Sequence, residues 1–199
     1  MDIDALRGRN AYILLCNDNP IRNSELAASA LNDVADIYLR LVEQRGWKTE
    51  RLDASVSWGG NGMSQTLWVK GWEAYGVLSE EPDRYCNRYA RPNAKHDTLE
   101  VWSRAYVVPE TQEYEWKPFR GEVREHVFWS FASTGPGDGI APAGVRLYHK
   151  PTGNGTDCRE IERIRVSGRQ PYILECNRKA AWSFLLHRLR GTDATQATI

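Results

Sequence analysis

Several features that would restrict the class of this protein are missing from its 199 residues. No run of 18 apolar residues occurs, although a helix needs roughly that many to cross a membrane. The N-terminal decapeptide MDIDALRGRN begins acidic and has no apolar core of signal-peptide length. We therefore expect no membrane association and a location in the cytoplasm or an organelle matrix.

Cysteine is scarce, and its spacing does not suggest a metal site. The four cysteines include no Cys-x-x-Cys pair, whereas zinc sites bring together four ligands that usually come in closely spaced pairs. Cys158, Cys176 and His187 do not form such a set. We expect no metal and no cofactor, and we expect the thiols to be reduced.

A net charge is also absent, since 26 basic residues balance 26 acidic ones. The charges are nevertheless unevenly distributed along the chain. Residues 1–116 contain 13 Lys and Arg against 18 Asp and Glu, a balance of −5, whereas residues 117–190 contain 13 against 7, a balance of +6. This asymmetry is typical of a chain whose C-terminal half meets a polyanion, although drift of surface charge gives the same pattern.

Apolar periodicity predicts an α+β fold in which helices pack on antiparallel strands. A long amphipathic helix is expected over 24–45, where Gly46 ends it, and a second helix over about 175–190. A turn is expected at Pro151–Gly153. The predicted strands are 10–18, 47–55, 64–72, 73–81, 100–110, 126–133 and 144–150.

A polar stretch at 111–126 is the expected domain boundary. It separates one domain over residues 8–116 from a second over 121–190, and residues 191–199 are expected to be a disordered tail. Glycines 135, 137 and 139 in STGPGDGIAP mark a loop inside the second domain.

Six segments of the sequence resemble one family in their order and, largely, in their spacing. The chain is similar to bacterial-type class I peptide-chain release factors, most of all to the type that reads UAA and UGA. The resemblance covers roughly residues 10–190. The segments are YLRLVEQRGWKTERLDAS, KGWEAYGVLSEE, YVVPE, STGPG, VRLYHKPTG and NRKAAWSFLLHRL.

This resemblance implies a codon-reading α/β domain over 8–116 and, over 121–190, a small α+β domain of the kind that carries the catalytic Gly-Gly-Gln. It also implies that the family's N-terminal helical domain is missing. The family's stop-codon tripeptide, Ser-Pro-Phe, falls on Ala90, Arg91 and Pro92, and its base-stacking histidine falls on Leu99. Since these residues lack the hydroxyl and the stacking rings, we expect codon recognition to be lost.

The family's Gly-Gly-Gln falls on Gly137, Asp138 and Gly139, in a loop three residues shorter than the family's. Ester hydrolysis needs a backbone N–H donor for the developing oxyanion and glycines that allow unusual backbone conformations. Gly139 keeps the N–H, but Asp138 adds a Cβ and a negative charge. The resemblance therefore implies a degenerate site and the loss of efficient peptidyl-tRNA hydrolysis.

A basic insertion of about ten residues, relative to the family, lies between Cys158 and Asn177. The insertion is interpreted as an added surface that binds RNA or a partner. A solvated loop in which Glu160 and Glu162 offset two of the arginines explains its composition equally well. Trp58, beside Gly59-Gly60, is a candidate for stacking on a base, although packing in the protein interior is commoner for tryptophan. The candidate RNA-binding residues are Arg159, Arg163, Arg165, Arg169, Arg178 and Lys179.

Three functions are compatible with these observations. The leading one is a release-factor-like protein that has lost both termination activities and binds the ribosome, tRNA or another structured RNA in an accessory or regulatory role. The second is a hydrolase or transferase acting on aminoacyl or peptidyl esters, with Asp138 as a base or water holder and Gly139 as a donor. The third is a module that binds a protein partner.

Overall fold

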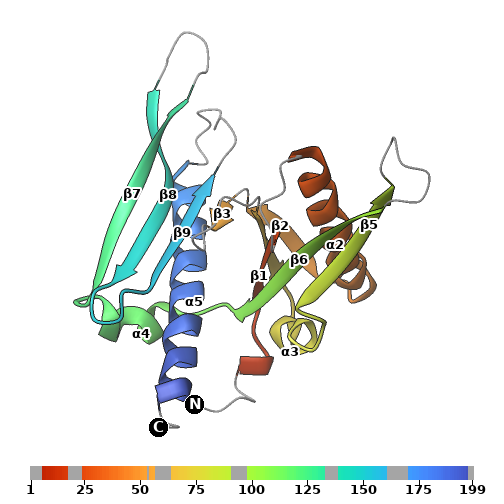
Figure 1. The fold of residues 1–199 in the computed structure, drawn as a ribbon. Helices are drawn as coiled ribbons and strands as arrows, with labels where there is room; N and C mark the ends of the chain where they lie inside the picture. The colour runs from red at the N-terminus through yellow and green to blue at the C-terminus, as the bar shows by residue number, and fades with distance from the viewer. Residues whose placement is uncertain are drawn as a thin grey trace. The chain divides into compact units, whose positions relative to one another are not determined.

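The structure, a computed structural model, describes residues 6–17, 24–52, 54–56, 64–90, 98–132, 139–160 and 170–196. The chain divides into two compact units, one of residues 1–51 and 59–107 and the other of 52–58 and 108–199. Each unit contains one β-sheet and at least one helix, so the expected α+β class is confirmed (Figure 1).

The first unit is built on a five-stranded sheet in the order β2-β4-β1-β6-β5. The helices α2 (Ser24–Gln44) and α3 (Ala74–Leu78) both contact β1. The strands are β1 (Ala11–Asn17), β2 (Lys48–Leu52), β4 (Ser64–Lys70), β5 (Arg84–Ala90) and β6 (Thr98–Pro109).

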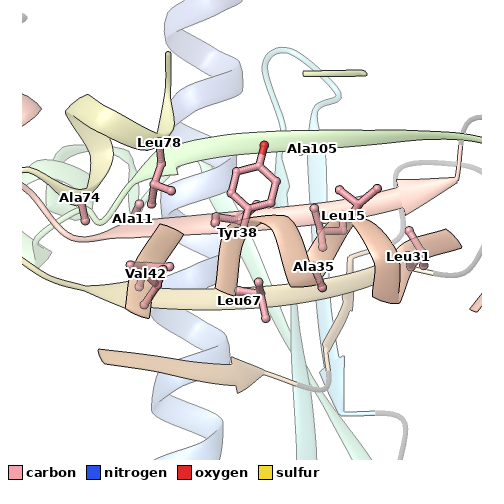
Figure 2. Close-up of a cluster of buried hydrophobic side chains, with 13 residues drawn as sticks. Ala11, Leu15, Leu31, Ala35, Tyr38, Val42, Leu67, Ala74, Leu78 and Ala105 are labelled. Carbon is pink, nitrogen blue, oxygen red and sulfur yellow. The ribbon is translucent and has the colours of Figure 1, made fainter. Parts of the chain in front are cut away.

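The core of the first unit lies between α2 and the sheet (Figure 2). In α2 the buried residues recur every three or four positions, which places them in one apolar stripe. In β1 alternate residues face this stripe, as the period of a strand requires. The cluster includes Leu31, Val34, Ala35, Tyr38 and Val42 of α2 with Ala11, Ile13 and Leu15 of β1.

Gly46 ends α2 as the sequence predicted. Its φ is +66°, a left-handed conformation that favours glycine. The N–H of Gly46 donates to the Glu43 carbonyl, and the N–H of Trp47 donates to the Val42 carbonyl, so two of the last helical carbonyls are satisfied.

Two sequence predictions in the first unit are wrong. The segment 73–81, expected as a strand, contains α3, because Ala74 and Leu78 lie one helical turn apart and are both buried. The segment 47–55, expected as one strand, forms β2 and β3 (Ala54–Val56), which belong to different sheets. The strand β5 was not predicted at all.

Glu73 precedes α3 with a φ of 61°, the one positive φ of a non-glycine residue among those described. A left-handed conformation costs an L-residue roughly 1–2 kcal/mol. We expect Glu73→Gly to stabilise the protein by about 0.5–1 kcal/mol, since the relieved strain exceeds the extra entropy of glycine. Urea denaturation measures this, with Glu80→Gly as the control. A lower free energy of unfolding for Glu73→Gly would contradict the prediction.

The second unit contains a four-stranded sheet in the order β3-β9-β8-β7. The long helix α5 (Gln170–Gln196) contacts β8 and β9. The remaining elements are α4 (Glu113–Trp116), η1 (Lys117–Phe119), β7 (Val123–Ala132), β8 (Gly139–His149) and β9 (Gly155–Glu160).

The core of the second unit is formed by the apolar face of α5 and by Trp116 of α4. The rings of Trp116 and Trp182 stack with centroids 4.8 Å apart and planes inclined by 13°. The Ser183 hydroxyl accepts from the Thr111 N–H at 3.0 Å, which ties the segment before α4 to α5. The Thr156 hydroxyl donates to the Ala181 carbonyl and ties β9 to the same helix.

The observed limits of the second unit differ from the expected ones. The boundary between units falls at Val107/Val108, earlier than 116–121, because residues 108–116 pack within the second unit. The prediction of a disordered tail is wrong for residues 191–196, which belong to α5. No proline interrupts the helix in this segment. Residues 197–199 lie outside the described chain.

Candidate functional site

The segment expected to correspond to the family's catalytic motif falls, in sequence, between the strands β7 and β8, which form a hairpin (Figure 1). The two strands are antiparallel, and Ala132 pairs with Gly139 at the loop end. The register shifts between Phe128 and Trp129, where Phe128 pairs with Gly144 and Trp129 with Pro142. A bulge at this point bends a hairpin and increases its twist.

Gly139 is therefore the first residue of a strand rather than part of the loop. The sequence placed the loop over 133–142, but β8 already begins at Gly139, so that limit is wrong. Gly137 and Asp138 lie outside the described residues. The position expected to replace the family's glutamine is thus held in a strand register directly opposite Ala132.

A polar cluster closes the other end of the same sheet. His149, whose side chain is 6% exposed, places Nε2 3.0 Å from Glu122 Oε2 and Nδ1 2.9 Å from Thr152 Oγ1. The Thr152 hydroxyl also accepts from the Asn154 N–H. The cluster fits the tautomer in which Nε2–H donates to Glu122 while Thr152 donates to Nδ1.

This cluster explains the HKPTG string in structural terms. The Gly153 N–H donates to the His149 carbonyl, and Gly153 has a φ of +71°, so the turn predicted at Pro151–Gly153 is confirmed. His149 and Thr152 hold that turn between β8 and β9. We assign them to the scaffold of the hairpin.

Two of the positions expected to correspond to codon reading, Ala90 and Leu99, lie at the end of the β5–β6 hairpin. Ala90 is the last residue of β5 and pairs with Thr98, while Leu99 pairs with Tyr89. Leu99 is half-buried. Arg91 and Pro92 lie outside the described residues. The structure thus brings the two flanks of the degenerate motif, Ala90 and Leu99, to the same hairpin end.

Next to these positions, the Tyr89 hydroxyl donates to Asp33 Oδ2 at 2.6 Å. Burial, followed by this hydrogen bond, raises the pKa of Tyr89 above its ordinary value. Tyr89 is therefore a neutral donor at physiological pH. It joins the hairpin to α2 and does not present a charge at the hairpin end.

The predicted RNA-binding residues fall in different environments. Arg178 of α5 contacts Glu125 Oε1 at 3.0 Å and Glu175 Oε2 at 2.8 Å, with 26% of its side chain exposed. Burial lowers the pKa of Arg178, but the two carboxylates outweigh burial and raise it. Lys179 is half-buried on the same helix. Arg159 lies in β9, but its side chain is outside the described part of the structure.

Arg178 also lines a pocket of about 350 Å³ that the sequence did not reveal. Arg120 closes one side, where it contacts Glu113 at 2.8 Å and lies over the Trp116 ring at 4.8 Å from the centroid. The stacked Trp116 and Trp182 form part of the wall. No spacing in the sequence marks this set, because α4, β7 and α5 each contribute to it and Arg120 follows η1.

The remaining expectations concern Trp58, Arg163, Arg165 and Arg169, which lie outside the described residues.

Within the described ranges, His, Cys, Asp and Glu side chains form no group of three or more that could hold a metal ion. Among the described helices, none is both long enough and apolar enough to cross a membrane.

Sequence comparison relates the chain to curated release factors. It is 30% identical over 138 residues to peptide chain release factor 1 of Anaeromyxobacter dehalogenans, covering 69% of this chain and 37% of that protein. It is 30% identical over 138 residues to peptide chain release factor 2 of Chloroflexus aggregans, covering 67% and 37%. The match to peptide chain release factor 1 of Frankia casuarinae is 30% over 183 residues, covering 87% and 48%.

Comparison of structures agrees with the sequence matches. RF2 of Thermus thermophilus superposes with a TM-score of 0.63 at 22% identity, covering 96% of this chain and 53% of that one, which shows a shared fold. The chain spans about half the length of the proteins it matches, or less. Both release-factor types occur among the matches, so they do not distinguish the UAA/UGA-reading type. No protein-family model matches the chain.

Proposed function

Because the chain is a homologue of bacterial peptide chain release factors, we propose that it is a release-factor-like protein that binds the ribosome or a structured RNA without terminating translation. Its role is that of an accessory or regulatory factor. One observation carries the proposal. The loop that aligns with Gly-Gly-Gln reads Gly137-Asp138-Gly139, and its third position starts a β-strand.

The chemistry explains why these changes matter. A developing oxyanion is stabilised by donors fixed 2.7–3.1 Å from it, so a displaced N–H loses most of its effect. An aspartate at the second position introduces a Cβ and brings a negative charge towards a phosphate-rich substrate. Gly139 pairs with Ala132. This pairing supports the view that the position of the Gly139 N–H donor is set by the register of the hairpin.

Loss of codon reading rests on the β5–β6 hairpin. Ala90 and Leu99 provide no hydroxyl and no aromatic ring at the hairpin end. A site that hydrogen-bonds a base loses specificity strongly when its polar groups are removed. These substitutions support a factor whose association with RNA does not depend on a stop codon.

Retained RNA binding rests on charge. Residues 117–190 have a balance of +6, and their arginines include Arg159, Arg163, Arg165 and Arg169. Arg178 and Lys179 complete the proposed surface. Because Glu125 and Glu175 already neutralise Arg178, we expect it to contribute less to phosphate binding than the arginines of the insertion.

The test is the salt dependence of RNA binding by the full chain. We expect sedimentation with ribosomes, and an affinity for fluorescein-labelled transfer RNA that falls steeply with salt. Each phosphate contact removed lowers the slope of log K against log[salt] by about 0.7–0.9. Arg163→Gln/Arg165→Gln/Arg169→Gln should therefore lower it by about two to three, and Arg178→Gln by less than about 0.5.

Arg40→Gln/Arg88→Gln, which removes two exposed arginines from the first unit, serves as the control. It should leave the slope unchanged. Binding that does not respond to salt, or a triple variant with the slope of the wild type, would refute the proposed surface.

A further inference from the structure

The sheet of the second unit has one face that packs against a helix and one that is exposed. Helix α5 contacts β8 and β9 (Figure 1). Along β8, Val145 and Leu147 are fully buried, whereas Arg146 and Tyr148 are exposed. Because successive side chains of a strand point to opposite faces, Arg146 and Tyr148 lie on the face away from α5.

Strand β7 extends this exposed face. Glu125 contacts Arg178 of α5 at 3.0 Å, so its side chain lies on the side that the helix covers. Arg124 and His126, its two neighbours in the strand, are exposed and therefore belong to the opposite side. The exposed face thus continues from β8 onto β7.

The register of the hairpin brings these exposed side chains together. Arg124 pairs with Tyr148, and His126 pairs with Arg146. The Cβ atoms of directly paired residues lie about 5 Å apart, and those of diagonal neighbours about 7–8 Å apart. We call these four residues the Tyr148 face. One aromatic ring therefore has two arginines and a histidine as its neighbours, a grouping that only the strand pairing creates.

The Tyr148 ring lies close to two glycines of the β8–β9 hairpin. A Cβ at Gly155, which pairs with Tyr148, would be 3.7 Å from Tyr148 Cδ2. A Cβ at Gly153 would be 3.8 Å from the Tyr148 hydroxyl oxygen. The ring is thus near the hairpin backbone at its edge and at its hydroxyl, while 45% of the residue stays exposed. A side chain placed in this way loses less freedom when a flat group stacks on it.

Positive charge predominates around this ring. Arg124, Arg146 and Lys150 are all exposed. Two acidic residues adjoin them, Glu122, whose carboxylate contacts the buried histidine of β8, and Asp157, which pairs with Arg146. Residues 117–190 as a whole have a balance of +6. Such a surface is complementary to a polyanion that carries flat rings, because the cations bind phosphates and the aromatic ring stacks on bases.

We infer that the Tyr148 face binds a single-stranded segment of RNA, with an unpaired base stacked on Tyr148 and the flanking phosphates at Arg124 and Arg146. The segment is single-stranded because the bases of a duplex are already stacked and cannot lie on a side chain. The inference rests on the proposed function for the class of partner, but it uses residues other than the arginines of the insertion. An acidic protein segment would also meet the arginines, but it would not need the ring.

The experiment is a fluorescence-anisotropy titration of fluorescein-labelled decauridylate with the full chain. Tyr148→Thr removes the ring and keeps a residue that favours strands. It should weaken binding about 5- to 150-fold, the range for the loss of one stacked base. Tyr148→Phe keeps the ring and should bind like the wild type. Arg124→Gln/Arg146→Gln should lower the slope of log K against log[salt] by about 0.7–1.4.

Tyr114→Ala is the matched control, since it removes a ring that is 68% exposed elsewhere in the second unit, and it should change nothing. Equal binding by the wild type and Tyr148→Thr, or no binding by the wild type, overturns the inference. An equal loss in Tyr148→Phe and Tyr148→Thr also overturns it, because the ring would then not be what binds. Labelled decaglutamate that binds with the same dependence on Tyr148 overturns it in favour of an acidic protein segment.

The same variants separate this inference from the proposed function. If transfer RNA and ribosomes bind the wild type but decauridylate binding does not depend on Tyr148, the inference fails and the proposed function stands. If decauridylate binding requires Tyr148 but neither transfer RNA nor ribosomes bind, the Tyr148 face stands and the proposed function fails.

Discussion

Peptidyl-tRNA on the ribosome should be hydrolysed at least about 1000-fold more slowly by this chain than by a release factor 1 under the same conditions. Removal of one positioned oxyanion donor costs about 100- to 1000-fold, and displacement of the reacting geometry adds to that loss. Asp138 stands in the place of a glycine, and Gly139 is held in a β-strand opposite Ala132. Release of labelled formyl-methionine from stop-codon complexes measures the rate.

Two variants sharpen this measurement. Asp138→Gly/Gly139→Gln restores the tripeptide, yet we expect it not to restore the rate, because the first residue of β8 still occupies the third position. Release by the wild type at the rate of a release factor would contradict the proposed function. If Asp138→Ala then abolished that release, the chain would instead be an ester hydrolase that uses the aspartate.

The largest expected loss of stability follows Trp182→Ala. The side chain is 2% exposed and stacks on Trp116, so truncation removes a large buried ring and leaves a cavity in the core of the second unit. Such substitutions cost about 3–5 kcal/mol. We expect the free energy of unfolding to fall by about that amount in urea denaturation followed by far-UV circular dichroism.

Trp72→Ala is the matched control, since it deletes the same side chain from a position that is 77% exposed. Its effect should stay within about 0.5 kcal/mol. A similar loss for both variants would mean that Trp72 packs against the protein. A small loss for Trp182→Ala would mean that the stacked pair contributes little to the core.

The elements with a strong local signal were predicted from the sequence. The apolar run at β1 and the periodic stripe of α2 both bury one continuous surface, so their residue patterns are unambiguous. Gly46 ended α2 as expected, because a left-handed position needs a residue without a Cβ. The resemblance to release factors was likewise readable, and the comparisons confirm it.

Short and composite features were not predictable in this way. The five-residue helix α3 is too short for its period to be told from that of a strand, and residues 47–55 carry no mark that they join two sheets. The pocket at Trp116 and Trp182 is lined by residues of α4, β7 and α5, and α5 is distant in the chain from the other two. Such a site exists only after the elements pack.

The chemical groups at the positions that correspond to termination follow from the amino-acid sequence alone. The side chains of the family motif are absent at Asp138, Gly139, Ala90 and Leu99. Folding cannot change this, because the side chains are part of the covalent structure of the chain. Which charged and aromatic groups are accessible to a binding partner depends on the packing of the elements. Arg178 is held by two carboxylates and Trp72 is presented to solvent, since burial and ion pairing depend on neighbours that only folding brings together.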